Sequence, residues 1–427
     1  MTTLLLIGGL SAFVLLSMLA GKAPQVLLYA LTVFAVASWD WPNLPALANL
    51  GGASVYVEDV AAGAMIVTVV ARPQRFWEVT KPFLPVLIVT GLSVLLSVGF
   101  GVALFGPKGV NEFRTFLYPL AAAAWGLNQE WRIEAWKGAV RRWVVITGAL
   151  LSLVAMMHIA LYGLGSVDSF VTSKFSGALQ TGRPLTAGQA VLLALCGVYL
   201  LQGLSNKNRR GLWWSVLFIG ITLVAQHRSV WIALAAGLVV LFFKVHGVAR
   251  ARVVVAAVVA AWGVAVLALS GIFNPFSEKF TDQVENLGTY GAREDSWTTL
   301  IGQNIDSGLG AVVFSSPFGS GFHRVENGVY VDWAPHNWYV TVYLRLGLAA
   351  IAVFAVLLLV VSLRLLRTRD VAAAAASFAV ILVFCWAYSM PWYIAPFFAW
   401  AMWSASKSEP RQVTERLPRL PAAYQKV

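Results

Sequence analysis

Long apolar stretches recur from one end of the chain to the other, and they constrain its fold more than any other feature. A helix that crosses a lipid bilayer needs roughly 17–25 mostly apolar residues. Charged residues make up 12% of the chain, about half the roughly 25% of a soluble domain. We therefore predict an all-α polytopic membrane protein with about 12–13 transmembrane helices. The number is given as a range because the last two candidate stretches are close enough to form one bent hairpin. The candidates lie at 3–20, 24–38, 52–71, 83–105, 112–128, 140–162, 187–204, 212–227, 230–244, 253–272, 337–362, 372–388 and 391–405.

The first stretch, "MTTLLLIGGLSAFVLLSMLAGKAP", has two interpretations. Its "SMLA" is similar to the cleavage site of a secretory signal peptide. It has no basic segment before the apolar run, however, and the run is long for a signal peptide. We therefore expect it to be retained as the first spanning helix.

Basic residues lie in alternate connections between the apolar stretches, including 72–81, 132–142, 207–210 and 364–369. Because Lys and Arg are enriched in cytoplasmic loops, these connections are predicted to face the cytoplasm. The net charge of +12 then reflects topology, and no nucleic-acid partner is expected. The resulting divisions are a bundle at 1–272 with an outer loop at 163–186, a large periplasmic loop at 273–336 that contains short helices, C-terminal transmembrane helices at 337–405 and a cytoplasmic tail at 406–427.

Several common site classes are missing from the sequence. There is no Gly-Lys-Ser/Thr phosphate loop, no His-Glu-x-x-His motif, no cysteine cluster and no compact Asp-x-Asp motif in the outer loops. Cys196 and Cys385 lie within apolar stretches, so no disulfide framework is predicted. We expect neither a metal nor a cofactor, and any positive charge offered to a phosphorylated lipid must come from arginine.

Three arginines are candidates for that task, because the planar guanidinium binds phosphate oxygens in pairs and stays charged. Arg228 follows "QH" at the start of a predicted helix, where backbone N–H groups also favour an anion. Arg293 lies in the large outer loop, and Arg183 precedes a span. The alternatives are contact with lipid headgroups for Arg228 and Arg183, and a surface ion pair with Glu294 or Asp295 for Arg293.

His336 is the candidate base, because it lies at the outer end of an apolar helix and imidazole accepts a proton near neutral pH. An ordinary interfacial histidine is the alternative. Asn337 is a candidate supporting residue, and so is His323, although its Gly-rich surroundings favour a structural role. Glu58 and Asp59 are charges at the edge of a span, and we favour a helix-capping role for them over a functional one.

Three segments resemble, in order and spacing, the domain shared by bacterial O-antigen ligases and O-antigen polymerases. They are "QHRSVWIALAAG", "GAREDSW…PFGSGF" and "HNWYVTVYLRLGLAA". The last has a His-Asn pair followed by a glycine, with nine residues between Asn337 and Gly347. The close resemblance covers about 225–350. It is incomplete, because family members often have a second glycine where this chain has Ala350.

The resemblance implies a metal-independent and ATP-independent glycosyl transferase that takes a glycan from undecaprenyl diphosphate at the periplasmic face. Arg228 and Arg293, and less directly Arg183, would bind the diphosphate. His336 would take the proton from the acceptor hydroxyl, and the anomeric carbon would be inverted. The His-Asn-x9-Gly segment favours a ligase that uses a lipid A–core acceptor.

Two alternatives stay open. The first is a polymerase of O-antigen or exopolysaccharide that uses the same donor and a second repeat unit as acceptor. The other is a transporter of polyprenyl-diphosphate glycans, in which the arginines bind a lipid that is moved across the membrane. A transporter of this kind commonly has internal repeats and charges along a path through the membrane, and neither is legible in the sequence.

Overall fold

The computed structural model describes residues 2–39, 46–50, 52–165, 170–174, 176–177, 179–202, 209–269, 288–326, 329–368 and 371–407. Within these ranges helices predominate, and the strands form only short antiparallel pairs. The predicted all-α character is therefore confirmed. Residues 273–287 of the predicted large loop and 408–427 of the predicted tail lie outside the described ranges.

The first half of the chain contains the helices that correspond to the first seven predicted apolar stretches, together with two strand pairs. Its elements are α1 (Thr2–Lys22), α2 (Gln25–Ala37), β1 (Ala48–Leu50), β2 (Ala53–Val55), α3 (Val57–Ala71), α4 (Pro73–Thr80), η1 (Lys81–Phe83), α5 (Leu84–Phe105), α6 (Pro107–Leu127), α7 (Glu134–Tyr162), β3 (Phe170–Thr172), β4 (Leu179–Thr181) and α8 (Ala187–Gln202).

The second half adds the remaining helices and one more strand pair. Its elements are α9 (Arg209–Val224), α10 (Arg228–Lys244), α11 (Val248–Leu269), α13 (Gly288–Asp306), α14 (Leu309–Phe314), β5 (Arg324–Glu326), β6 (Val329–Val331), α15 (Trp338–Arg367), α16 (Ala372–Ala387), η4 (Trp392–Ile394) and α17 (Ala395–Ser406). The short helices expected in the large outer loop are present as α13 and α14.

The stretch predicted as a span at 52–71 becomes helical later than expected. Its first residues belong to the β1–β2 hairpin, which turns at Gly52 with a φ of 88°, and α3 starts only after Tyr56. The carboxylate of Asp59 accepts the Tyr56 N–H at 2.8 Å and so caps this helix. The capping interpretation is therefore confirmed for Asp59, which also pairs with Arg114 at 2.9 Å.

Three helical segments of the described residues are long and apolar enough to cross a membrane, judged by length and composition. They are Pro73–Phe105, Glu134–Tyr162 and Trp338–Arg367. Several other apolar helices are shorter, among them Gln25–Ala37 and Ala372–Ala387. The fold is thus compatible with a membrane protein, and the full set of twelve or thirteen spans stays a prediction.

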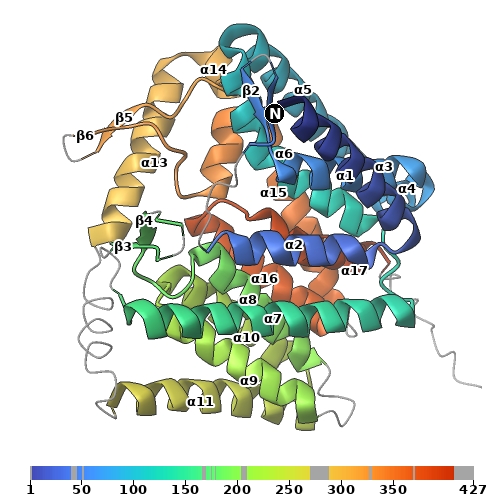
Figure 1. Ribbon diagram of the computed structural model, residues 1–427, viewed down its shortest axis with the longest axis vertical. Helices are drawn as coiled ribbons and strands as arrows, with labels where there is room; N and C mark the ends of the chain where they lie inside the picture. The colour runs from blue at the N-terminus through green and yellow to red at the C-terminus, as the bar shows by residue number, and fades with distance from the viewer. Residues whose placement is uncertain are drawn as a thin grey trace, which may run out of the picture.

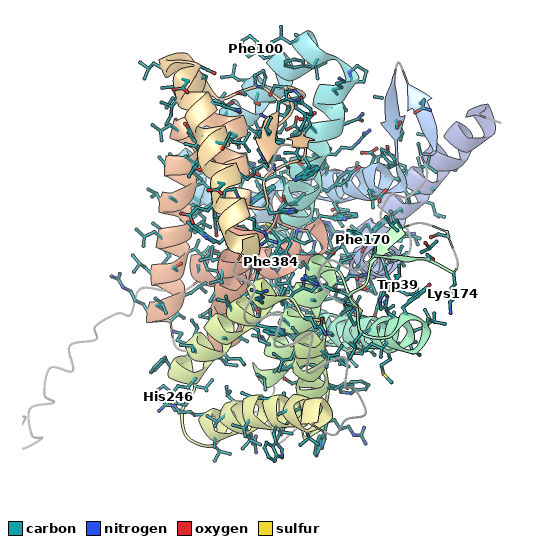
Figure 2. The ribbon with its side chains drawn as sticks, turned by 90° about the vertical axis from the view of Figure 1, so that its left-hand side faces the viewer. Trp39, Phe100, Phe170, Lys174, His246 and Phe384 are labelled. Carbon is teal, nitrogen blue, oxygen red and sulfur yellow. The ribbon has the colours of Figure 1, made fainter. Side chains whose placement is uncertain are left out.

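The elements of both predicted outer loops lie on the same side of the molecule. Figure 1 places β3–β4, β5–β6 and α13 at its left edge, whereas α4, from the basic connection at 72–81, lies at the right edge. Helix α7 runs from one edge toward the other. Figure 2 looks onto the left edge, where α13 passes in front and the buried Phe384 projects near the centre of the view.

The Gly-rich turn after α14 is docked against the turn between α5 and α6. Phe318 is fully buried and its ring packs edge-on against Phe113 and Phe116, with centroid distances of 5.5 and 5.1 Å. A Cβ atom at Gly101 would lie 2.3 Å from the carbonyl oxygen of Phe318. Glycine at 101 therefore permits the close backbone contact that fixes the segment leading to His323 and His336.

Helix α15 is bent at Gly347, which has a φ of 80° and a ψ of 177°. Its position leaves no room for a side chain, because a Cβ atom would lie 2.1 Å from the carbonyl oxygen of Val313. The bend frees two helix carbonyl groups, and residues after α14 bind both of them. The Ser316 N–H donates to Leu344 O at 3.2 Å, and the Ser315 hydroxyl donates to Arg345 O at 2.6 Å.

An ion pair buried near this bend connects α15 with α6. The guanidinium of Arg345 is 1% exposed; its Nε donates to Glu112, and its Nη2 donates to Gly321 O at 2.6 Å. The second carboxylate oxygen of Glu112 accepts the Gly319 N–H at 2.7 Å. Both ends of the pair therefore hold the Gly-rich turn, a structural role that the sequence analysis did not anticipate.

Candidate functional site

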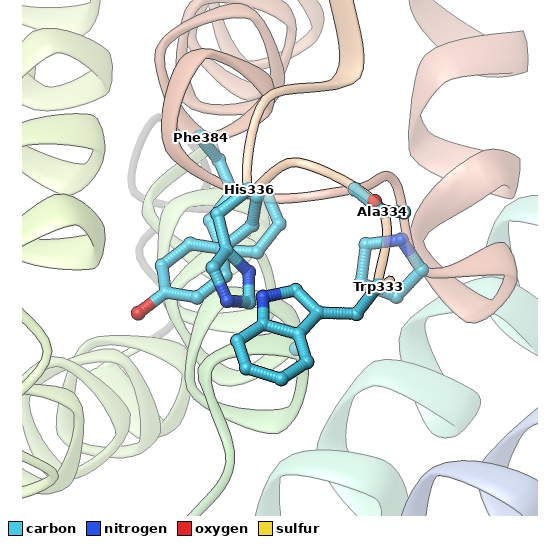
Figure 3. Close-up of a pocket in the computed structure, with 8 residues that line it drawn as sticks. Trp333, Ala334, His336 and Phe384 are labelled. Atoms are coloured by element: carbon cyan, nitrogen blue, oxygen red, sulfur yellow. The ribbon is translucent and has the colours of Figure 1, made fainter. Parts of the chain in front are cut away.

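A cavity of about 570 Å³ lies where the segment before α15 meets the ends of α16 and α8. His336, Trp333 and Ala334 come from that segment, and Phe384 and Tyr388 come from the C-terminal end of α16 and the residue after it. Figure 3 shows the imidazole of His336 beside the indole of Trp333, with Ala334 on the same loop. The cavity thus brings an imidazole together with the aromatic rings of Trp333, Phe384 and Tyr388.

His336 is held in place by the residue that follows it. Asn337 is 1% exposed and is the N-cap of α15, because its side-chain oxygen accepts the Tyr339 and Val340 N–H groups at 2.9 and 3.1 Å. The side chain of His336 is exposed and lies edge-on to the Tyr388 ring at 5.8 Å. Asn337 therefore supports the site by fixing the backbone from which the imidazole reaches the cavity.

Tyr388 is also the contact that brings Arg293 to this cavity. Arg293 lies on α13, and its guanidinium is 5.0 Å from the centre of the Tyr388 ring. It donates to the Tyr388 hydroxyl at 3.3 Å and to the Ala387 carbonyl at 3.4 Å. Since His336 contacts the same tyrosine, the predicted base and a predicted diphosphate ligand share one neighbour.

Arg183 approaches Tyr388 from the segment before α8. Its Nη1 lies 2.7 Å from Nδ1 of His227, whose Nε2 lies 2.8 Å from Leu185 O. Because a guanidinium only donates, Nδ1 of His227 is the acceptor and Nε2–H donates to the carbonyl, which makes the ring neutral. The imidazole therefore fixes the orientation of Arg183.

The three predicted arginines act on one another electrostatically. Burial lowers the pKa of Arg183, its hydrogen bond with Tyr388 raises it, and the charges of Arg293 and Arg228 lower it. Arg228 is half-buried and is the first residue of α10, directly after His227. Arg183, Arg228 and Arg293 come from three separate elements and lie close enough for their charges to interact, and their shared role stays a prediction.

Among the described residues, no group of three or more His, Cys, Asp or Glu side chains is arranged to hold a metal ion. Arg293 and Arg183 lie next to the cavity, because both contact Tyr388 in its lining. Comparisons with protein-family models, curated proteins and solved structures gave no match.

His323 lies apart from this group of residues. Its Nδ1 contacts the Tyr330 hydroxyl and lies 3.1 Å from the Asp332 carboxylate, and its ring stacks on Tyr330. It does not line the cavity described above. These contacts join the residue before β5 to the β5–β6 hairpin, which agrees with the structural role that the sequence favoured.

Two residues at the centre of the site were not predicted from the sequence. Tyr388 contacts His336, Arg293 and Arg183, although it lies far from all of them in the chain. His227 precedes Arg228 in a motif that was considered only for its arginine. A usable signal was present for each: a histidine directly beside a candidate ligand, and a tyrosine in the Pro-containing break "WAYSMPWY" between two apolar helices.

Proposed function

We propose that this chain is an integral membrane glycosyl transferase, specifically an O-antigen ligase of a bacterial inner membrane. It transfers a glycan from undecaprenyl diphosphate to a sugar of a lipid A–core acceptor at the periplasmic face. The observation that carries the proposal is the arrangement around Tyr388, where Arg183, Arg293 and the imidazole of His336 come together from three parts of the chain.

Mutual repulsion among the arginines supports an anionic ligand. Like charges held close together in a partly buried site cost free energy, and an anion placed between them removes that cost. A diphosphate offers several oxygens to guanidinium groups, which bind such oxygens in pairs. A diphosphate leaving group also gains charge as its bond breaks, so these cations stabilise the transition state more than the bound donor.

The transfer step follows from these positions. The acceptor hydroxyl attacks the anomeric carbon of the donor sugar, and its proton passes to the neutral imidazole of His336. A new glycosidic C–O bond forms as the C–O bond to the diphosphate breaks, and the bonding electrons leave with the diphosphate. Attack on the face opposite the leaving group inverts the anomeric carbon, and the proton later returns to solvent.

The proposed location has its own support. Exposed apolar side chains such as Leu95, Trp213 and Trp262 lie on helices that a bilayer would cover. Helix α13 and the β3–β4 and β5–β6 hairpins gather on one side, opposite the basic connection at 72–81 (Figure 1), and the cavity residues Trp333, Ala334 and His336 follow directly after β6. Under the positive-inside rule that side faces the periplasm.

The function is tested by reconstituting the purified protein with a glycan on undecaprenyl diphosphate and with lipid A–core. Transfer is expected without added nucleotide and in excess EDTA, because arginines take the place of a divalent ion. Product is measured by gel mobility and mass spectrometry. Loss of transfer on chelation, restored by magnesium, would contradict the arginine-based mechanism. Donor elongation in the absence of lipid A–core would favour the polymerase, and lipid movement without transfer would favour the transporter.

Replacing the arginines by lysine separates charge from geometry. Arg228→Lys and Arg293→Lys keep the positive charge but lose the planar fork, so we expect the transfer rate of each to fall by about 10²-fold. Rates are compared at equal amounts of membrane-inserted protein. Arg75→Lys is the matched control, because Arg75 is about half exposed and forms only a long 3.8 Å contact with Glu130. Near-normal rates in both site variants would show that paired contacts with the diphosphate are not needed.

A further inference from the structure

We infer that Trp333 stacks on a pyranose ring of the acceptor and so forms the acceptor-sugar subsite of the cavity. This inference rests on the proposed transferase function and adds the residue that recognises the second substrate. The supporting observations are the exposure of the indole, the rigidity of the backbone that carries it and its place beside His336.

The indole of Trp333 is available to a ligand. The residue is 54% exposed and lines the same cavity as His336, and Figure 3 shows the two rings beside each other. Large aromatic side chains in ligand cavities supply broad apolar contact at a small cost in conformational entropy, because they have few rotatable bonds. An exposed tryptophan inside a cavity is therefore a ready contact surface.

The backbone around Trp333 is fixed before any ligand arrives. Arg324 is 4% exposed, and its Nη1 donates to the carbonyl groups of Trp333 at 2.8 Å and Phe322 at 2.9 Å. The neighbouring Asp332 accepts the Phe322 N–H at 2.7 Å. The bond to Trp333 uses its main-chain carbonyl and fixes its backbone, and the indole itself lies 5.9 Å from the Arg324 guanidinium. A surface held in this way loses little freedom when a ligand binds.

The chemistry of the ring selects a sugar. A pyranose has an apolar face of C–H groups that can cover an indole, and an edge of hydroxyl groups that can reach a base. A cavity with Trp333 beside His336 presents both partners at once. Tryptophan is also common at membrane–water interfaces, but a residue with that role faces the lipid around the protein, whereas Trp333 faces a cavity that contains the proposed base.

The geometry favours the acceptor sugar over the donor sugar. Arg183 and Arg293 hold the leaving diphosphate on the side of His336 that contacts Tyr388. The attacking hydroxyl enters opposite the leaving group, so the acceptor ring occupies the other side of the reacting carbon. Trp333 belongs to the loop that Arg324 of β5 holds by a hydrogen bond to the Trp333 carbonyl, and the Trp333 ring lies 5.9 Å from that guanidinium.

The test measures binding of each substrate separately in the full-length protein in detergent. Isothermal calorimetry with a soluble core oligosaccharide reports the acceptor side, and the undecaprenyl-diphosphate glycan reports the donor side. Trp333→Ala is expected to weaken oligosaccharide binding about tenfold, a factor typical of one lost aromatic contact, and to leave donor binding unchanged. Trp333→Phe should recover part of the loss. Trp262→Ala, at an exposed position on α11, is the control and should match the unaltered protein.

The outcomes separate the inference from the proposed function. Unchanged oligosaccharide binding in Trp333→Ala would overturn the inference, and so would a loss of donor binding in place of acceptor binding. If the unaltered protein transfers glycan and Trp333→Ala transfers it with the same acceptor KM, the inference fails alone. If oligosaccharide binding depends on Trp333 but no transfer occurs, the sugar subsite stands and the transferase proposal fails.

Discussion

Replacing His336 by alanine is expected to lower the transfer rate by roughly 10²–10⁴-fold, the usual contribution of a positioned base. The variant loses the proton acceptor, while Arg293 keeps its contacts with Tyr388 and Ala387. Donor binding should therefore persist as turnover is lost. Rate and donor affinity are measured on the same detergent preparation. In the unaltered protein the rate should also fall at acid pH, because a protonated imidazole accepts no proton.

His323→Ala is the matched control for this experiment. His323 contacts Tyr330 and Asp332 at the hairpin and lies outside the cavity lining, so its loss should affect loop order more than turnover. Loss of donor binding together with turnover in His336→Ala would identify the imidazole as a diphosphate ligand. Normal turnover in that variant would leave His336 as an interfacial residue and remove the proposed base.

The second large effect concerns stability. Glu112→Ala is expected to lower the free energy of unfolding by about 3–5 kcal/mol, the range for breaking a buried ion pair from one side. The change leaves the guanidinium of Arg345 buried without its carboxylate, and the Gly319 N–H loses its acceptor. The loss is measured by unfolding the protein with denaturant in detergent. The fraction of protein that stays monodisperse is monitored at each denaturant concentration.

An exposed pair provides the comparison. Arg75→Ala removes the partner of Glu130, and both side chains are close to half exposed. Pairs of this kind contribute about 0–1 kcal/mol, so the variant should unfold almost like the unaltered protein. Equal losses in Glu112→Ala and Arg75→Ala would show that the connection between α6 and α15 is not a main support of the fold.

The positions of the helices follow closely from the apolar stretches, because burial in lipid or in a helix bundle needs long runs of apolar residues. The stretch at 372–388, for example, corresponds to α16 (Ala372–Ala387). The ends are less well predicted. Helix α7 begins at Glu134, six residues before the predicted 140, because its basic first turns continue the helix outside the apolar run. The hairpins were missed because strands of three residues have too little periodicity to recognise.

Prediction of the candidate site from the sequence is limited in a different way. Local motifs indicated Arg183, Arg228, Arg293 and His336 as candidates, since residue type and position relative to a helix end carry chemical information. Nothing local indicated that Tyr388 contacts three of these side chains, because such contacts depend on how α13, α15 and α16 pack together. The same reason explains why Glu112 and Arg345 were not recognised as a pair across the sequence.

The bend at Gly347 has a mechanical consequence for the cavity. The carbonyl groups that it frees accept hydrogen bonds from Ser315 and Ser316, so the bend is fixed and does not act as a hinge. It divides α15 into a short arm that begins beside His336 and a long arm that packs along α5. The short arm is hydrogen-bonded to the turn after α14, and the long arm packs within the helix bundle. We therefore expect the bend to limit movement of the long arm relative to the short arm, which begins beside His336.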